Sequence, residues 1–291
     1  MSFAPAKINL FLHVGPLAAD GYHPISSLMT FADVGDELVS IPAAKPEFEI
    51  AGPFACGLES GPDNLVIRAR DALMAALGSK APSLRLVLTK NLPIASGIGG
   101  GSADAAAALH LICQAAGVAS DGEVVAAIAR SLGADVLACL SGEPALARGR
   151  GDELGPAPAF PSLHAVLVNP LVASPTAEVY RAYDASPTMK EENQPEFPSV
   201  MRSAGEAAAW LAGCRNDLQA PAIALRPRIG EALAALAGEP ETLLARMSGT
   251  GATSFALCRD QADATALERK LAERNPLWWV RRTVLAGSSG R

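Results

Sequence analysis

Short stretches of the chain are rich in apolar and β-branched residues or alternate between apolar and polar positions, which predicts β-strands. They are residues 8–14, 35–41, 48–50, 84–93, 164–170 and 254–258. Other stretches repeat apolar positions every three or four residues, which predicts amphipathic helices. They are residues 63–77, about 102–116, 120–132, 203–211, 229–236 and 261–274. Because strands and helices are mixed in both halves, we expect an α+β fold.

The most clearly delimited of these helices follows Ser120. Ser120 and Glu123 have the spacing of a capping box, and Gly133 follows the expected end. The expected apolar face consists of Val124, Val125, Ile128 and Leu132.

A proline-rich stretch at residues 155–163 is the best candidate for a linker. A chain of 291 residues is long enough for one large or two medium-sized domains. We therefore expect two domains, residues 1–155 and residues 156–291.

Composition narrows the class of protein. A formal net charge of -6 does not favour binding to nucleic acid, which usually needs a basic surface. The five cysteines are scattered, with no metal-binding spacing, which indicates reduced and mostly buried thiols. No signal peptide and no run long enough to span a bilayer is found. The expectation is a cytoplasmic protein without a membrane partner.

One segment, LPIASGIGGGSADAAAAL at residues 92–109, points to chemistry. A helix exposes unpaired N–H groups and partial positive charge at its N-terminus, and a glycine-rich approach adds further backbone donors for an anion. The Walker A pattern is absent because no lysine follows the loop, and Ser102 stands where the dinucleotide-binding pattern needs its last glycine. The alternative is a flexible loop with ordinary helix capping.

Eight segments, in order along the chain, carry a resemblance to a known family. They are AKINLFLHVGPLAADGYHPISSLM, PDNLVIRA, LPIASGIGGGSADAAAAL, LGADV, ARGRGDEL, SPTAEVY, CRNDL and MSGTGATSF. The chain resembles the GHMP kinase superfamily and, within it, the 4-diphosphocytidyl-2-C-methyl-D-erythritol kinases. The resemblance implies a two-domain fold, with a ribosomal-protein-S5-domain-2-like ATP-binding domain, a ferredoxin-like C-terminal domain and a substrate cleft between them.

The reaction that this resemblance implies moves the γ-phosphoryl group of ATP, with Mg²⁺, to the 2-hydroxyl of the cytidylylated alcohol in the non-mevalonate isoprenoid pathway. Asp135 matches the family's catalytic aspartate, which would accept the hydroxyl proton or orient the alcohol. Lys7 matches the lysine beside that hydroxyl, where an ammonium stabilises developing charge. Asp104 is expected to support the helix N-terminus rather than to bind metal, and no residue is assigned to Mg²⁺.

The remaining site residues also follow from the resemblance. The expected nucleotide-binding residues are Pro93, Ile94, Ala95, Ser96, Gly97, Ile98, Gly99, Gly100, Gly101, Ser102 and Ala103. The expected substrate-binding residues are Asn9, Tyr22, His23, Thr176, Tyr180, Ser248, Gly249, Thr250 and Gly251. Tyr22 and Tyr180 would stack on the cytosine, and His23 would contact its polar edge.

Two alternatives stay open. A different small-alcohol kinase of the superfamily would keep both glycine loops but would not need Tyr22, His23 and Tyr180. A non-catalytic nucleotide-binding relative would be free to lose Lys7 and Asp135, which this chain has. The chain departs from the family pattern at residues 137–139 and matches nothing recognisable at 184–200. We expect a monomer or a weak homodimer.

Overall fold

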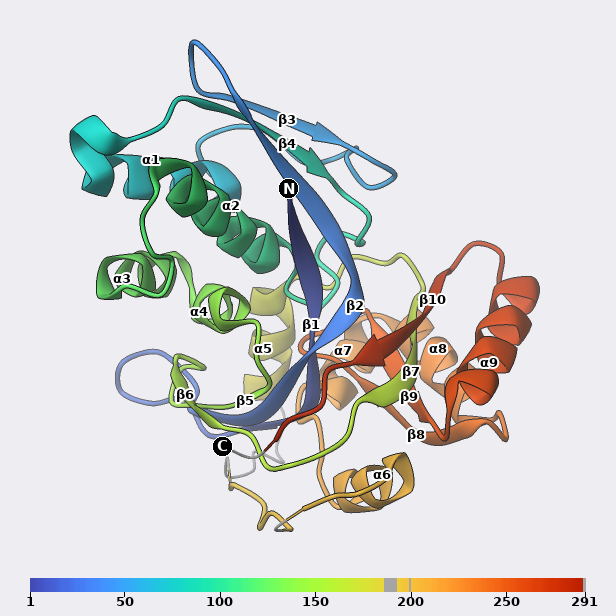
Figure 1. The fold of residues 1–291 in the computed structure, drawn as a ribbon. Coiled ribbons are helices and arrows are strands. Elements are labelled where there is room, and N and C mark those ends of the chain that lie inside the picture. Colours follow the sequence, from blue (N-terminus) through green and yellow to red (C-terminus); the bar gives the residue numbers. More distant parts are fainter. Residues whose placement is uncertain (186–192, 199, 290–291) are drawn as a thin grey trace. The chain divides into compact units, whose positions relative to one another are not determined.

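The computed structural model describes residues 1–185, 193–198 and 200–289, and its chain forms two compact units (Figure 1). The first unit comprises residues 1–6, 35–94 and 99–142, and the second comprises residues 7–34, 95–98 and 143–291. Strands β1 (Ser2–Val14) and β2 (Ile25–Pro42) contribute residues to both units. The unmatched stretch 184–200 lies partly outside the described residues.

In the first unit, three strands form a sheet on which helices pack. Strand β4 (Leu84–Thr89) lies between the end of β2, to which it is antiparallel, and β3 (Glu47–Ala51), to which it is parallel. The helical elements are α1 (Leu65–Leu77), the short η1 (Gly78–Lys80), α2 (Gly100–Ala116), α3 (Glu123–Leu132) and α4 (Ala134–Ser141). Helix α2 packs against α1, α4 and β4, and its small alanines at 103 and 105–108 are buried in these contacts.

The second unit is built on an antiparallel sheet. Its strands are β5 (Ala145–Arg148), β6 (Glu153–Pro156), β7 (Leu163–Asn169), β8 (Thr242–Met247), β9 (Ser254–Cys258) and β10 (Trp279–Leu285). Four of them pair in the order β10-β7-β9-β8, while β5 pairs with β2 and β6. Its helices are α5 (Thr176–Asp184), α6 (Ala204–Ala212), α7 (Gln219–Leu225), α8 (Pro227–Ala237) and α9 (Gln261–Arg274).

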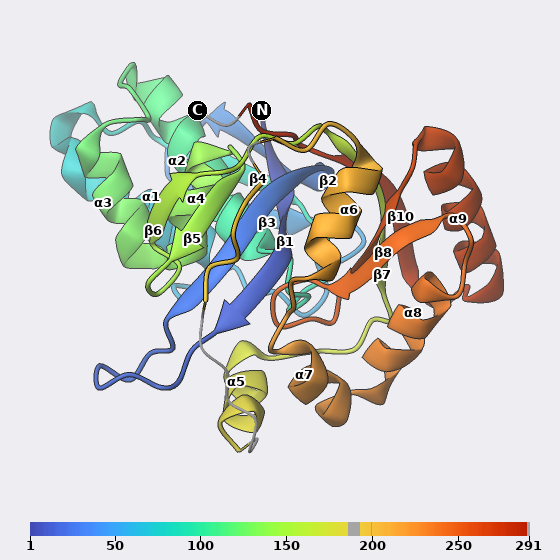
Figure 2. The same ribbon diagram turned by 90° about the horizontal axis from the view of Figure 1, so that it is seen from below.

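Helices α8 and α9 cover one face of the β10-β7-β9-β8 sheet (Figure 2). Val166 and Ala256 of the sheet, Leu236 of α8 and Leu267 of α9 belong to one buried apolar cluster. Burial of this surface supplies most of the free energy that holds helices on a sheet. Trp278 packs at the edge of the cluster, and Trp279 begins β10.

The expected α+β fold class is confirmed. The expected helix over 120–132 begins only at Glu123, because Gly122 is its N-cap and no side chain caps it, so the proposed capping box is wrong. Val124 is 60% exposed and does not belong to the buried face, whereas Val125 is buried. The strand expected over 84–93 ends at Thr89.

Three other expectations concern the thiols, the membrane and the linker. Four of the five cysteines are buried and none is in a disulfide. Among the described residues, no helix is long and apolar enough to cross a membrane. The proline-rich segment 155–163 lies within the second unit and joins β6 to β7, and a domain boundary at residue 155 stays a prediction.

Candidate functional site

The glycine segment leads into α2 as a phosphate-binding loop should. Helix α2 begins at Gly100, two residues earlier than expected, and Gly99 is its N-cap with a left-handed φ of 65°. No side chain caps the helix, and the first intrahelical bond runs from the N–H of Ala103 to the carbonyl of Gly99. The N–H groups of Gly100, Gly101 and Ser102 have no intrahelical acceptor, which is the arrangement that binds anions.

Residues 95–98 of the same segment belong to the second unit, where the backbone of a second glycine loop approaches them closely. Gly97 has a φ of +74°, and a Cβ placed there would lie 2.5 Å from the carbonyl oxygen of Ser248 and 2.6 Å from the nitrogen of Gly251. Ser96 accepts a 3.0 Å hydrogen bond from the N–H of Thr253. The site therefore excludes any side chain at residue 97.

The second loop, Ser248–Gly251, is anchored from several directions within its unit. The Ser248 hydroxyl donates to the carbonyl of Gly97 (3.1 Å) and accepts from the N–H of Asn9 (3.1 Å). Asn216, from the CRNDL segment, donates its amide to the carbonyls of Met247 (2.8 Å) and Gly249 (2.9 Å). The CRNDL motif by itself indicates no role for Asn216.

Lys7 is almost completely buried, at 4% exposed. Its Nζ donates to Asn9 Oδ1 at 2.8 Å, and the backbone N–H of Lys7 donates to the carbonyl of Ile98 at 2.9 Å. Asn9 Nδ2 in turn donates to Ser27 Oγ at 2.8 Å. The ammonium is thus held by a chain of bonds that starts on β1, next to the segment 95–98.

Asp135 is in the first turn of α4 and is half-buried. The preceding helix α3 ends at Leu132, so Asp135 belongs to a separate helix. A carboxylate in the first turn is stabilised by the helix dipole. Lys7 and Asp135 belong to different compact units, and their cooperation stays a prediction.

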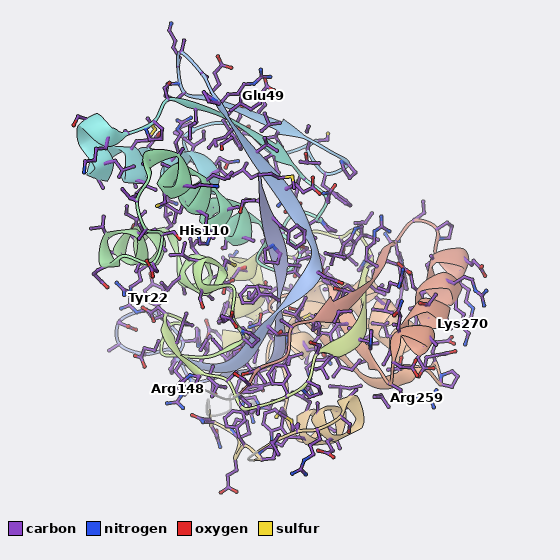
Figure 3. The ribbon with its side chains drawn as sticks, in the orientation of Figure 1. Tyr22, Glu49, His110, Arg148, Arg259 and Lys270 are labelled. Carbon is purple, nitrogen blue, oxygen red and sulfur yellow. The ribbon has the colours of Figure 1, made fainter. Side chains whose placement is uncertain are left out.

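Tyr22 lies at an exposed turn between β1 and β2 and is 54% exposed (Figure 3). The guanidinium carbon of Arg150 is 4.2 Å from the centre of its ring, a cation–π contact. Arg150 also donates to Asp20 Oδ2 (2.8 and 3.1 Å), and Asp20 Oδ1 accepts the N–H of Tyr22 (3.1 Å). Both the N–H of Tyr22 and Arg150 lower the pKa of Asp20. The contacts hold the Tyr22 ring in place.

The ring of Tyr180, on α5, lies beside the ring of His23, in the loop between β1 and β2. The two ring centres are 5.2 Å apart. His23 Nδ1 is 2.9 Å from the carbonyl of Gly15, and Nε2 is 3.1 Å from Asp184 Oδ1. Both ring nitrogens of His23 therefore already have protein partners. Thr176 Oγ1 is 3.3 Å from Thr250 Oγ1, which brings two of the expected substrate-binding residues together.

Family models match both parts of the chain: the GHMP kinases N terminal domain over residues 64–143 and the GHMP kinases C terminal domain over residues 198–277. A 4-diphosphocytidyl-2-C-methyl-D-erythritol kinase of Caulobacter sp. (strain K31) is 56% identical over 287 residues, which is 98% of each chain. The chain belongs to the 4-diphosphocytidyl-2-C-methyl-D-erythritol kinase family. The expected family, the GHMP kinase fold and the assignment as a kinase are thereby confirmed.

Solved structures agree with the family. A crystal structure of a 4-(cytidine 5'-diphospho)-2C-methyl-D-erythritol kinase superposes with a TM-score of 0.78 at 32% identity and covers 99% of each chain. A homoserine kinase from Cytophaga hutchinsonii superposes with a TM-score of 0.68 at 19% identity, covering 98% of this chain and 94% of the other. This second likeness shows the shared fold alone.

One feature of this family member was not expected from its sequence: a buried cluster of Asp36, Lys90 and Asp104. Lys90 Nζ donates to Asp104 Oδ2 at 2.7 Å and also to Asp36 Oδ2. Burial lowers the pKa of Lys90, but the two carboxylates outweigh it and raise that pKa overall. Burial raises the pKa of Asp104 to about 7, against the opposing effect of Lys90. Asp104 bonds to Lys90 and does not cap α2.

Proposed function

We propose that this protein transfers the γ-phosphoryl group of ATP to the 2-hydroxyl of 4-diphosphocytidyl-2-C-methyl-D-erythritol. The observation that carries the proposal is a sequence identity of 56%, over 98% of the chain, to a relative that bears this kinase's name. Two local arrangements support it: the open N-terminus of α2 behind a glycine loop, and the buried ammonium of Lys7 held beside Asn9.

The glycine segment suits a nucleotide triphosphate. Residues 93–103 would surround the β- and γ-phosphates with backbone N–H groups. Gly97 has no side chain that could keep the phosphates away from this backbone. Bound ATP supplies the phosphoryl group, and Mg²⁺ neutralises its charge. The described residues contain no group of three His, Cys, Asp or Glu side chains suited to a metal, and no residue is assigned as a Mg²⁺ ligand.

Lys7 and Asp135 are proposed as the catalytic pair. In-line phosphoryl transfer depends on positioning and on charge stabilisation more than on covalent chemistry. Lys7 would stabilise the negative charge that develops on the attacking oxygen. Asp135 would accept the proton of that hydroxyl or hold it in line.

Tyr22 and Tyr180 are proposed to contact the cytosine. Arg150 covers one face of the Tyr22 ring, so the base would use the opposite face. His23 has both ring nitrogens engaged with Gly15 and Asp184, so its role would be to support Tyr180 rather than to read the base directly.

Asn9, Thr176 and the loop Ser248–Gly251 would contact the diphosphate and the methylerythritol. We propose further that residues 1–155 form the nucleotide-binding domain and 156–291 the C-terminal domain, and that the protein acts in the cytoplasm as a monomer or weak homodimer.

The test is ADP release by the purified protein with Mg²⁺ and ATP. The cytidylylated alcohol is compared with mevalonate and homoserine as acceptors, and Asp135→Asn serves as the variant. We expect release only with the cytidylylated alcohol and a loss of most of kcat in Asp135→Asn. Release with another alcohol alone would identify a different small-alcohol kinase. Nucleotide binding without release for any acceptor would indicate a non-catalytic relative.

A further inference from the structure

The buried cluster of Asp36, Lys90 and Asp104 contains two carboxylates and one ammonium. The three side chains are no more than 4% exposed, and Lys90 bonds to both acids. With both acids ionised, the cluster carries one uncompensated negative charge. An unpaired charge at a buried site has a high free-energy cost, and a proton on one carboxylate removes that charge.

The two carboxylates are not equivalent. Asp36 Oδ1 accepts the backbone N–H groups of Asn91 (2.6 Å) and Leu92 (2.8 Å). Asp104 Oδ1 is buried and has no hydrogen-bond partner among the described residues. The proton that the cluster takes up therefore belongs on Asp104, in accord with a pKa for this carboxyl that burial raises to about 7.

The cluster lies at the base of the phosphate-binding segment. Lys90 stands three residues before Pro93, the first of the residues proposed to surround the phosphates, and Asp104 directly follows Ala103, the last of them, as the fifth residue of α2. Lys90 Nζ would be 3.0 Å from a Cβ on Gly100, the first residue of the helix. The charge of the cluster is consequently about one helical turn from the N–H groups that are proposed to bind phosphate.

Several charged groups surround Asp104. Lys90, directly after β4, and Asp36, on β2, are the charged groups that most affect its pKa. The helices packed against α2 carry further charges: Arg68, Arg70 and Asp71 on α1, and Asp135 on α4. These four are not among the main causes of the shift.

We propose that the binding of nucleotide phosphates at the start of α2 favours a proton on Asp104, so that binding takes up protons from solvent. The phosphates bring negative charge toward a cluster that is itself negative, and protonation of Asp104 makes the cluster neutral. By linkage, the same coupling makes nucleotide binding weaker as pH rises through the range in which Asp104 loses its proton. The inference rests on the proposed function, because it places nucleotide phosphates at this helix.

The experiment is isothermal titration calorimetry of the whole protein with MgADP, whose phosphates hold almost no proton above pH 7. Titrations at pH 7.5 in buffers of different ionisation enthalpy give the number of protons taken up. We expect uptake of about half a proton if binding moves the Asp104 titration by one pH unit. Asp104→Asn should take up none, and its Kd should stay constant from pH 7 to 8.5 while that of the unaltered protein rises about three- to tenfold.

Asp71→Asn is the matched control, because it makes the same chemical change at an exposed position on α1. It should keep the proton uptake of the unaltered protein. Equal uptake in the unaltered protein and in Asp104→Asn would overturn the inference, while leaving the proposed nucleotide site intact. If the unaltered protein takes up no proton on binding at any pH from 6.5 to 8.5, that result alone would overturn the inference. Failure of the unaltered protein to bind MgADP would overturn both this inference and the proposed function.

Discussion

The Nζ of Lys7 donates a 2.8 Å hydrogen bond to the Oδ1 of Asn9, two residues further along the same strand. Residues i and i+2 of a strand share one face, so β1 itself brings the two side chains together. Asn9 is held in turn by Ser27, whose hydroxyl donates to the carbonyl of Phe11 at 2.6 Å. These bonds, all internal to the second unit, help to hold the ammonium in position.

Lys7→Met should lower kcat on the order of a hundredfold or more, because it removes a preorganised charge and keeps much of the volume. Asn9→Ala should have a smaller effect, since Lys7 keeps its charge and loses one hydrogen-bond acceptor. Steady-state kinetics with ATP and the cytidylylated alcohol, together with melting temperatures, check this prediction. A Lys7→Met enzyme with unchanged kcat would remove Lys7 from the catalytic pair.

Gly97→Ala should destabilise the protein and weaken nucleotide binding. Its φ of +74° and the backbone atoms 2.5–2.7 Å from the added Cβ together cost about 1–3 kcal/mol or more of unfolding free energy. Gly101→Ala is the matched control, because the nearest atom to its Cβ, on Leu65, is 3.7 Å away and its position is helical. Chemical denaturation should give Gly101→Ala a stability equal to or above that of the unaltered protein. Equal losses at both positions would contradict the close approach at Gly97.

Arg150→Gln should raise the KM for the cytidylylated alcohol roughly threefold and leave the KM for ATP unchanged. The reason is that the Tyr22 ring is exposed, and without the guanidinium it must be ordered when the base binds. Arg148→Gln, two residues away and also exposed (Figure 3), is the control and should change neither value. A rise of equal size in both variants would indicate a general charge effect instead.

The free energy of unfolding should decrease as pH rises from about 4 to about 7, to the extent that Asp104 controls it. Its pKa is raised from the ordinary value of 3.8 to about 7 in the folded protein, chiefly by burial. Between these values the folded state holds a proton that the unfolded state has lost, so rising pH favours unfolding. Urea denaturation at pH 5 and pH 8 should show a shallower decrease in Asp104→Asn. An identical pH dependence in the two proteins would show that Asp104 does not titrate in this range.

Local patterns in the sequence predicted the elements whose ends carry their own signals. Helix α9 is an example, since Asp260 accepts the N–H of Asp263 as an N-cap and the apolar positions repeat regularly. Helix α4 is only eight residues long and follows Gly133 without a side-chain cap, so no periodic pattern distinguishes it from a turn. Helix α5 begins after Pro175, also without a side-chain cap.

Strand β8 was missed for a different reason, because its residues are mostly half-buried and do not alternate clearly. It carries the buried Arg246, which donates to the carbonyls of Leu10, Leu211 and Cys214. Burial lowers the pKa of this guanidinium. The bond to Leu10 joins residues more than 200 positions apart, and no local signal marks it.

The residues of the candidate site also differ in how far the sequence could predict their roles. Lys7 and Asn9 could be named individually because both stand in one motif, and their hydrogen bond follows from strand geometry. Arg150 was within a recognised motif but had no evident role until its guanidinium was seen over the Tyr22 ring. Asp36, Lys90 and Asp104 come from three separate elements, and only the folded chain brings them together.

The order in which the chain builds its two units bears on how it could be shortened. The chain passes from one unit to the other at residues 6/7, 34/35, 94/95, 98/99 and 142/143. A fragment beginning at residue 156 would lack residues 7–34, and with them the strand residue Leu12, whose N–H donates to the carbonyl of Arg215 and whose carbonyl accepts the N–H of Asp217. No single cut yields both units whole, so proteolytic nicking or gene truncation should not release either of them as an independently folding piece.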